Sequence, residues 1–187
     1  MTAHFANSFE AGIELAPGQG QMSFAKGTRI ATTRGEVVAE TLTTRHRVLS
    51  RDAGVQRVAR VGAVTVKVQD ASQRPVTIRA GALGQNLPQA DLTVPPTQQV
   101  LVFGEVAAEL FGADEVFVEA AALTVLDGVS RADVTEYEVV EVLFAASTAV
   151  LANGAWVDAP NAVSATAGDI GGMFPGLAEI GMDLGQP

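Results

Sequence analysis

Residues 74–103 read RPVTIRAGALGQNLPQADLTVPPTQQVLVF, and this stretch decides the fold. Three short runs rich in aliphatic and β-branched residues, Pro75–Arg79, Leu92–Val94 and Val100–Phe103, predict strands. A Gly-, Asn- and Pro-containing loop at Gly81–Pro88 separates the first two runs, and a Pro-Pro corner separates the last two. The stretch therefore predicts short strands joined by tight turns.

The same pattern continues on both sides. One short helix is predicted at Glu105–Phe111, closed by Gly112, and Asn153-Gly154 predicts a hairpin turn. Gly62 is expected to interrupt a strand. The further predicted strands are Thr28–Thr33, Glu36–Ala39, Arg47–Ser50, Val55–Val61, Val64–Val68, Val116–Glu119, Leu123–Leu126, Thr135–Phe144, Thr148–Leu151 and Trp156–Val157. The chain is expected to be all-β.

Composition limits the function. The 187 residues carry a net charge of −9, which argues against nucleic acid or an anionic membrane as partner. Cysteine is absent, so the chain has no disulfide, thiolate nucleophile or zinc–thiolate site. No apolar run approaches the roughly 18 residues that span a bilayer, and no secretory signal or cofactor motif is evident. A soluble domain without a cofactor is predicted.

Both ends of the chain differ from its centre. We expect an N-terminal extension at residues 1–22, a β-domain at residues 23–160 and a C-terminal arm at residues 161–187. The two arms are poor in core-forming residues but contain apolar anchors. Either the domain's own surface or a neighbouring chain is expected to hold them, and the anchors favour a contact across another subunit. These interaction candidates are Phe5, Phe9, Phe174, Leu177, Ile180, Met182 and Leu184.

Three motifs carry a family resemblance. The opening Ser23-Phe24-Ala25-Lys26-Gly27-Thr28-Arg29-Ile30, the block at residues 74–103 and the segment Tyr137–Gly154 together resemble the Hedgehog/intein (Hint) domain. The central block looks like the Hint proteins of marine alphaproteobacteria and their phages. The resemblance covers residues 23–160 and implies a pseudo-twofold horseshoe of short strands.

The resemblance also implies a self-cleavage site whose residues are mostly replaced here. In the family, a first Cys or Ser attacks the preceding carbonyl, a Ser/Thr-x-x-His motif polarises that amide, and later histidines assist. The matching positions here are Ser23, Pro95, Gln98, Glu141 and Ser147. Gln and Ser cannot take up a proton at neutral pH. The site is therefore interpreted as degenerate.

The predicted function is a non-catalytic structural or interaction protein. Other protein subunits are the expected partners, in a homo-oligomer or a larger repeated assembly such as a phage or phage-like particle. Capsid decoration or a tail or neck part would each fit, with the chain in the virion or in the bacterial cytoplasm during assembly. Two alternatives stay open: slow self-processing through Ser23, and a ligand-binding module that uses the horseshoe cleft.

Remaining polar clusters have simpler interpretations. Arg45 and Arg47 begin a basic concentration that continues through Arg51, Arg57 and Arg60, read either as solubilising charge or as a docking patch for an acidic neighbour, such as another copy's Glu-rich strand. His46, Ser50 and Asp52 lie close in sequence, but a solvated histidine is expected rather than a triad. Glu136, Glu138 and Glu141 could suggest paired carboxylates or a cation site. Glu136 and Glu138 share one face of a strand by the period of two, and a solvated strand face is expected instead.

Overall fold

The computed structural model describes residues 20–146 and 148–158, and nearly all of them belong to strands and the turns between them. A ten-stranded sheet follows the order β1-β11-β5-β4-β2-β12-β13-β8-β9, with β3 paired to β2, and a three-stranded sheet follows the order β10-β6-β7. The strands are β1 (Gly20–Ala25), β2 (Arg29–Thr32), β3 (Gly35–Val38), β4 (Arg47–Leu49), β5 (Val55–Lys67), β6 (Val76–Ile78), β7 (Leu92–Val94), β8 (Gln99–Phe103), β9 (Glu115–Glu119), β10 (Val129–Arg131), β11 (Glu136–Phe144), β12 (Val150–Ala152) and β13 (Ala155–Asp158).

Four short helical segments complete the described part of the chain. These are α1 (Glu105–Phe111) and three 3-10 turns, η1 (Ala39–Thr41), η2 (Ala71–Gln73) and η3 (Ala120–Val125). Over the described residues, no helix has the length and apolar character needed to cross a bilayer.

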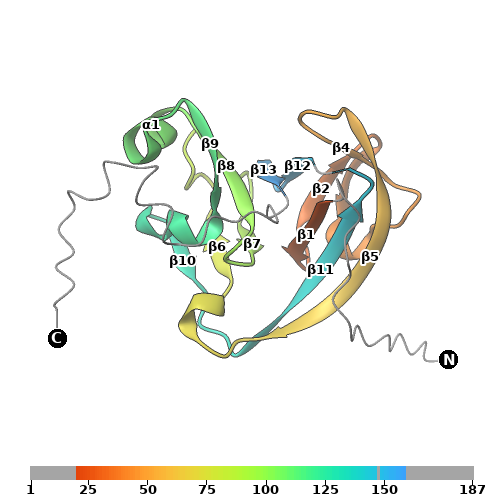
Figure 1. The fold of residues 1–187 in the computed structure, drawn as a ribbon, viewed down its shortest axis with the longest axis horizontal. Helices are drawn as coiled ribbons and strands as arrows, with labels where there is room; N and C mark the ends of the chain where they lie inside the picture. Colours follow the sequence, from red (N-terminus) through yellow and green to blue (C-terminus); the bar gives the residue numbers. More distant parts are fainter. Residues whose placement is uncertain (1–19, 147, 159–187) are drawn as a thin grey trace.

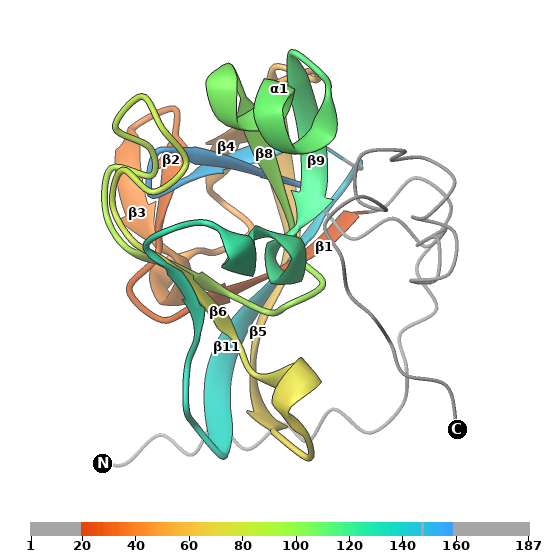
Figure 2. The same ribbon diagram turned by 90° about the vertical axis from the view of Figure 1, so that its left-hand side faces the viewer.

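The elements form two lobes (Figure 1). One lobe holds β1, β2, β4 and the upper part of β5, and the other holds β6 to β10 with α1. The long β5–β11 ribbon runs along the bottom of this view between the lobes, and β12 and β13 connect them at the centre. The quarter-turn view places α1 at one end of the second lobe, above η3 (Figure 2).

Buried and less buried side chains alternate along β1 and β11, and the buried ones form one wall of the core. Met22 and Phe24 are fully buried on one face of β1, and Val142 and Phe144 are fully buried on the same face of β11. The opposite face of β1 is half-buried at Gln21, Ser23 and Ala25. A period of two therefore sends one set of side chains to the core and the other to the surface of the lobe.

The predicted all-β fold class is confirmed. The helix at Glu105–Phe111 is confirmed with its left-handed cap at Gly112 (φ 65°), a conformation that glycine adopts without steric penalty. The Asn153-Gly154 turn is confirmed between β12 and β13.

Two predicted elements were wrong. Gly62 does not break a strand: β5 runs unbroken from Val55 to Lys67 because β11 pairs with nearly all of it, and Gly62 lies opposite Glu141. The predicted strand Leu123–Leu126 is instead part of η3, where the chain turns and only Leu123 of that run is fully buried. Tertiary context overrides local β-propensity at both places.

The described chain begins close to the expected domain boundary. β1 starts at Gly20, three residues before Ser23, and Met22 is fully buried. The expected arm residues Phe5, Phe9, Phe174, Leu177, Ile180, Met182 and Leu184 lie outside the described residues, so their proposed role as anchors stays a prediction.

Replacing Phe24 by alanine is expected to lower the free energy of unfolding by about 3–5 kcal/mol, because a fully buried ring is lost from the wall between β1 and β11. Phe117→Ala is the matched control: its side chain is half-buried on the outer strand β9, so a clearly smaller loss is expected. Urea denaturation followed by circular dichroism measures both. Equal losses would contradict the packing described here.

Candidate functional site

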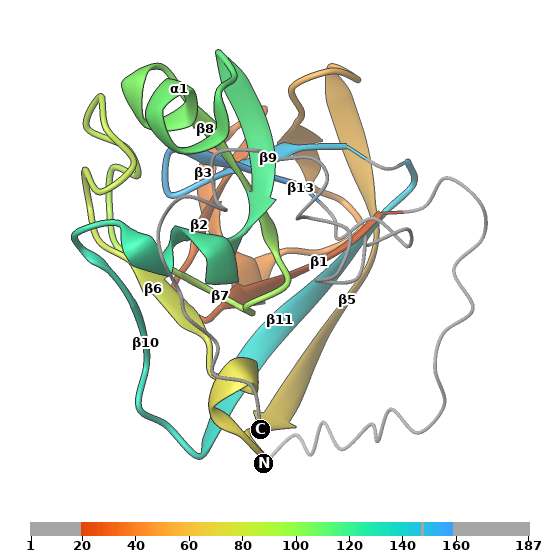
Figure 3. The same cartoon turned by 60° about the vertical axis from the view of Figure 1, so that its left-hand side comes forward.

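The site begins with the pairing of β1 and β11. The register is continuous over all six residues of β1, and it sets Ser23 directly opposite Glu141 (Figure 3 shows the two strands side by side). Side chains directly opposite in an antiparallel pair lie on the same face. The hydroxyl of Ser23 and the carboxylate of Glu141 are therefore neighbours on the face that points away from the core.

Gln98 holds the backbone of Ser23 from the other side. The Ser23 N–H donates to Gln98 Oε1 at 3.1 Å, although the two residues are 75 positions apart. Since this N–H is not used in the β1–β11 ladder, Ser23 and Glu141 form a non-hydrogen-bonded cross-strand pair. Such pairs bring Cα atoms to about 4.5 Å, closer than hydrogen-bonded pairs do.

The Gln98 side chain is buried and satisfied at both ends. Only 1% of the residue is exposed. Its Nε2 donates to the backbone carbonyl of Asp158 at the end of β13, while its Oε1 accepts from Ser23. The two partners fix which end of the amide is oxygen and which is nitrogen. Gln98 therefore joins β1 to β13 by hydrogen bonds that need no proton transfer.

Pro95 begins the turn that presents Gln98. The Gln98 N–H donates to the Pro95 carbonyl at 3.1 Å, which closes the turn between β7 and β8. β7 contacts β1, so this turn is brought against Ser23. Proline has no hydroxyl, and the neighbouring Thr97 is exposed. The turn places a hydrogen-bond acceptor on Ser23 without the hydroxyl that the resemblance implies at Pro95.

A pocket of about 400 Å³ lies over this arrangement. It combines the outer face of β1 and β11, the end of β5, the η2 segment and the turn before β8. Its lining residues are Ser23, Val66, Lys67, Gln69, Gln73, Pro95, Pro96, Thr97, Tyr137, Val139 and Glu141.

Besides Glu141, the pocket wall contains two titratable groups, Lys67 and Tyr137. The Tyr137 phenol donates to the Gln73 carbonyl at 3.4 Å, a long contact. Burial raises the pKa of Tyr137 above its ordinary value. The phenol therefore stays protonated at neutral pH and offers no base to Ser23.

The chemistry open to the site follows from these groups. Acyl transfer to Ser23 needs a base for its hydroxyl proton and an acid for the departing amide nitrogen. Glu141 is a carboxylate on the correct face, but no hydrogen bond joins it to the Ser23 hydroxyl in the described structure. The group on the amide nitrogen is the neutral amide of Gln98, which has no proton to give there.

The structure brings together four of the five residues that the sequence resemblance matched to the self-cleavage site. Ser23, Pro95 and Glu141 line one pocket, and Gln98 contacts Ser23 from beneath it. Ser147 lies outside the described residues. Ser23 is the fourth residue of β1 and is half-buried.

Sequence reasoning missed the rest of the pocket wall. Tyr137 and Val139 share a face with Glu141 by the period of two in β11, and this alternation was a usable signal. Lys67 and Gln73 come from segments that only the tertiary fold brings near, and no local pattern identifies them.

The remaining clusters take simpler roles. His46 Nδ1 accepts from the Thr43 N–H at 2.9 Å within its own turn, so it makes no triad with Ser50 and Asp52. Glu138 pairs with Lys26, on the strand face opposite to that of Glu141. Within residues 20–146 and 148–158, no group of His, Asp and Glu is placed to hold a metal ion.

The basic residues on the β4–β5 hairpin are exposed. Arg45 and Arg47 point to solvent, and Arg47 lies directly opposite Arg57. Arg51 differs, because its guanidinium makes two hydrogen bonds, at 2.8 and 2.6 Å, to the carboxylate of Glu115.

Comparison with known proteins gives one family. The model of the Hint domain matches residues 22–160. No curated protein sequence matches the chain.

Three solved structures are similar at low identity. An intein-like domain from Clostridium thermocellum is 14% identical with a TM-score of 0.49, over 74% of this chain and 98% of that chain. A splice-inactive variant of the AceL NrdHF class 3 split intein is 12% identical with a TM-score of 0.44, over 74% and 98%. The MchDnaB-1 intein is 14% identical with a TM-score of 0.43, over 73% and 98%.

Replacing Gln98 by alanine is expected to lower the free energy of unfolding by about 2–4 kcal/mol, because the Ser23 N–H and the Asp158 carbonyl both lose a buried partner. Gln99→Ala, the half-buried neighbour, is the control and is expected to cost less than about 1 kcal/mol. Denaturation midpoints give both values. Amide exchange at Ser23 should also accelerate in the Gln98 variant alone, and an unchanged exchange rate would contradict the contact.

Proposed function

The chain belongs to the Hint-domain family, and from this premise we propose that it is a non-cleaving member that serves as a structural or interaction protein. The observation that carries the proposal is the contact between Ser23 and Gln98. A neutral amide occupies the place on the Ser23 N–H where self-cleavage requires a group able to deliver a proton.

The reaction fails at a defined step. Attack of the Ser23 hydroxyl on the Met22 carbonyl forms a carbon–oxygen bond and breaks the carbon–nitrogen bond, so the nitrogen of Ser23 must gain a proton. Gln98 accepts from that nitrogen and cannot protonate it. An amine that leaves without its proton is a poor leaving group, and the peptide bond therefore persists.

The strand pairing around the Met22–Ser23 peptide bond also opposes an acyl shift. Met22 is fully buried, and β1 pairs with β11 on both sides of the Met22–Ser23 bond. An N-to-O acyl shift would have to move the backbone out of this register. The peptide bond is therefore held within paired backbone on both sides.

The proposed setting is a repeated assembly with other subunits, such as a phage or phage-like particle, in which the chain acts as a capsid-decoration, tail or neck component. Three features support it: the lost chemistry, the apolar anchors expected in residues 1–22 and 161–187, and the exposed arginines on the β4–β5 hairpin. On this proposal the Hint fold is retained as a scaffold, and it acts in the virion or in the bacterial cytoplasm during assembly.

A second function is favoured by one observation. Glu141 lies directly opposite Ser23 and can receive the hydroxyl proton if the side chains rotate together. Slow self-processing through Ser23, which would release residues 1–22, is therefore the alternative to test. A ligand-binding role would use the same pocket, whose wall has one tyrosine and no tryptophan among its lining residues.

We expect the full chain to keep its intact mass for days at neutral pH, with or without hydroxylamine, because no group protonates the Ser23 nitrogen. Restoring the family's residues as Ser23→Cys, Pro95→Ser and Gln98→His is expected to produce hydroxylamine-sensitive cleavage before residue 23. The matched control carries Pro95→Ser and Gln98→His with Ser23→Ala, and it should remain intact. Intact-mass spectrometry reads all three proteins.

Release of residues 1–22 from the unchanged chain is the result that would overturn the proposal, provided that it stops in Ser23→Ala. The same time course in Glu141→Gln then identifies the base. A release that is lost in both variants assigns slow processing to the Ser23–Glu141 pair, whereas the absence of release from the unchanged chain supports the non-cleaving role.

A further inference from the structure

Charge is divided unequally between the two lobes. Residues 20–68 contain nine Lys or Arg and three Asp or Glu, whereas residues 70–134 contain three Lys or Arg and nine Asp or Glu. The first segment builds the lobe of β1 to β5, and the second builds the lobe of β6 to β10 with α1 (Figure 1). The glutamates of β11, which pairs with β1 and β5, add three acidic residues to the first lobe. The first lobe still has an excess of basic residues and the second an excess of acidic ones.

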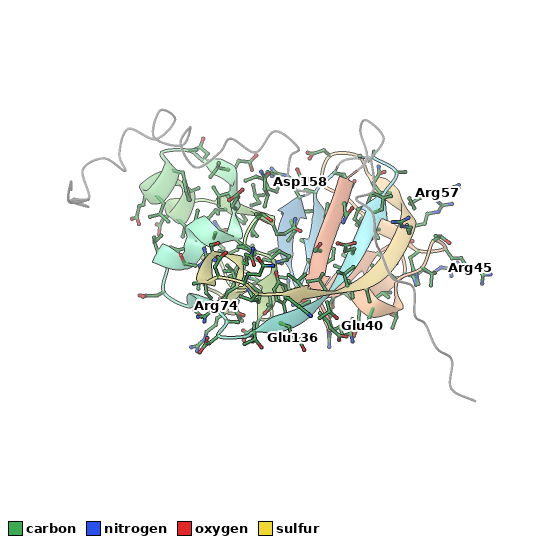
Figure 4. The ribbon with its side chains drawn as sticks, turned by 60° about the horizontal axis from the view of Figure 1, so that its bottom comes forward. Glu40, Arg45, Arg57, Arg74, Glu136 and Asp158 are labelled. Atoms are coloured by element: carbon green, nitrogen blue, oxygen red, sulfur yellow. The ribbon has the colours of Figure 1, made fainter. Side chains whose placement is uncertain are left out.

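The basic end has a defined face, which we call the hairpin face: Arg45, Arg47, Leu49, Val55 and Arg57. Cross-strand register sets Arg47 opposite Arg57 and Leu49 opposite Val55, so the four side chains form two adjacent rungs on one side of β4 and β5. Figure 4 shows Arg45 and Arg57 pointing outward at the end of the molecule away from the green α1 lobe.

This face carries two unfavourable features at once. Like charges directly opposite in a sheet repel each other, and the four ion pairs of the described residues do not include these arginines. Leu49 and Val55 are 39% and 47% exposed. An acidic partner with an apolar side chain would relieve both.

The second lobe has the complementary set, which we call the helix face: Glu105, Glu109, Val125 and Asp127. These residues belong to α1, to η3 and to the turn after η3, and the two helical elements lie on the same side of the lobe (Figure 2). Glu105 and Glu109 are exposed at spacing i,i+4 on α1, where like charges also repel. Val125 is 72% exposed on η3, beside the exposed Asp127. Leu49, Val55 and Val125 are the exposed large hydrophobic residues of the described chain, so all of them fall on these two faces.

We propose that the hairpin face of one copy docks on the helix face of a second copy, in a head-to-tail contact. The opposite charges of the two faces would steer one copy towards the other. Burial of Leu49, Val55 and Val125 in the contact would add to its affinity. Such a heterologous contact uses two different surfaces, so each bound copy leaves one of each face exposed. Repetition produces a ring if the rotation closes and an open chain if it does not.

The proposal rests on the proposed role in an assembly and specifies which surfaces join the copies. It is independent of the Ser23 pocket, whose lining residues belong to neither face. If the head-to-tail contact is disproved, the non-cleaving role can therefore still be tested, and the reverse is also true.

The test is sedimentation velocity on the full chain over a range of concentrations. Wild-type protein should self-associate at about 0.05 M salt. It should dissociate at about 0.5 M salt, where the Debye length is only a few ångströms and charges on the two faces are screened from each other. Arg47→Glu with Arg57→Glu, and separately Glu105→Lys with Glu109→Lys, should each give monomers. Both double variants keep a like-charged pair, so their stability should match that of the wild type.

A mixture of the two double variants gives the decisive test of the head-to-tail contact. Each retains the intact face that the other needs, so the mixture should associate although neither component does alone. Lys67→Glu with Arg79→Glu is the control, since it changes the net charge equally at sites outside both faces and should leave association in place.

Wild-type protein that remains monomeric at low salt would overturn the head-to-tail contact, whereas the non-cleaving role would still be judged by intact mass. Association that survives in both double variants would show that copies meet through other surfaces and would equally overturn the assignment.

Discussion

The pairing of β1 with β11 is the constraint on which the rest of the structure depends. Because six residues of β1 stay in register, Met22 and Phe24 enter the core and Ser23 must face Glu141 on the other side. The same register turns the Ser23 N–H away from β11, where Gln98 accepts it. Core packing and site geometry are thus two consequences of one strand alignment.

Gln98 separates two properties that a histidine would combine. A side chain at this position accepts a hydrogen bond, which positions the backbone of Ser23, and in a cleaving site it also moves a proton. Gln98 performs the first task and is fixed by its second bond to the Asp158 carbonyl. Both ends of its buried amide are satisfied, so a glutamine at this position supports the backbone without supplying an acid.

Local patterns were sufficient for much of the fold and insufficient for the site. Helix α1 and the Asn153-Gly154 turn follow from short-range rules about glycine and hydrophobic spacing. Gly62 misled because its effect depends on β11, a partner distant in sequence. Ser23, Pro95 and Gln98 were located as a motif, but the contact that relates them, between residues 75 positions apart, is a property of the folded chain. Lys67 and Gln73 reach the pocket for the same reason.

The separation between the pocket and the two charged faces has a mechanical consequence. The pocket lies where β1, β11 and the turn before β8 meet, whereas the hairpin face and the helix face occupy the two lobes. Contacts between copies at those faces would add no side chain to the pocket and take none away. A Hint scaffold can therefore lose the proton carriers beside Ser23 without changing the surfaces through which it meets a neighbour. On the proposed function, this independence would make a change from a self-processing domain to a structural component physically simple. Substitutions that stop the reaction would lie in the pocket, and those that govern association would lie on the two charged faces.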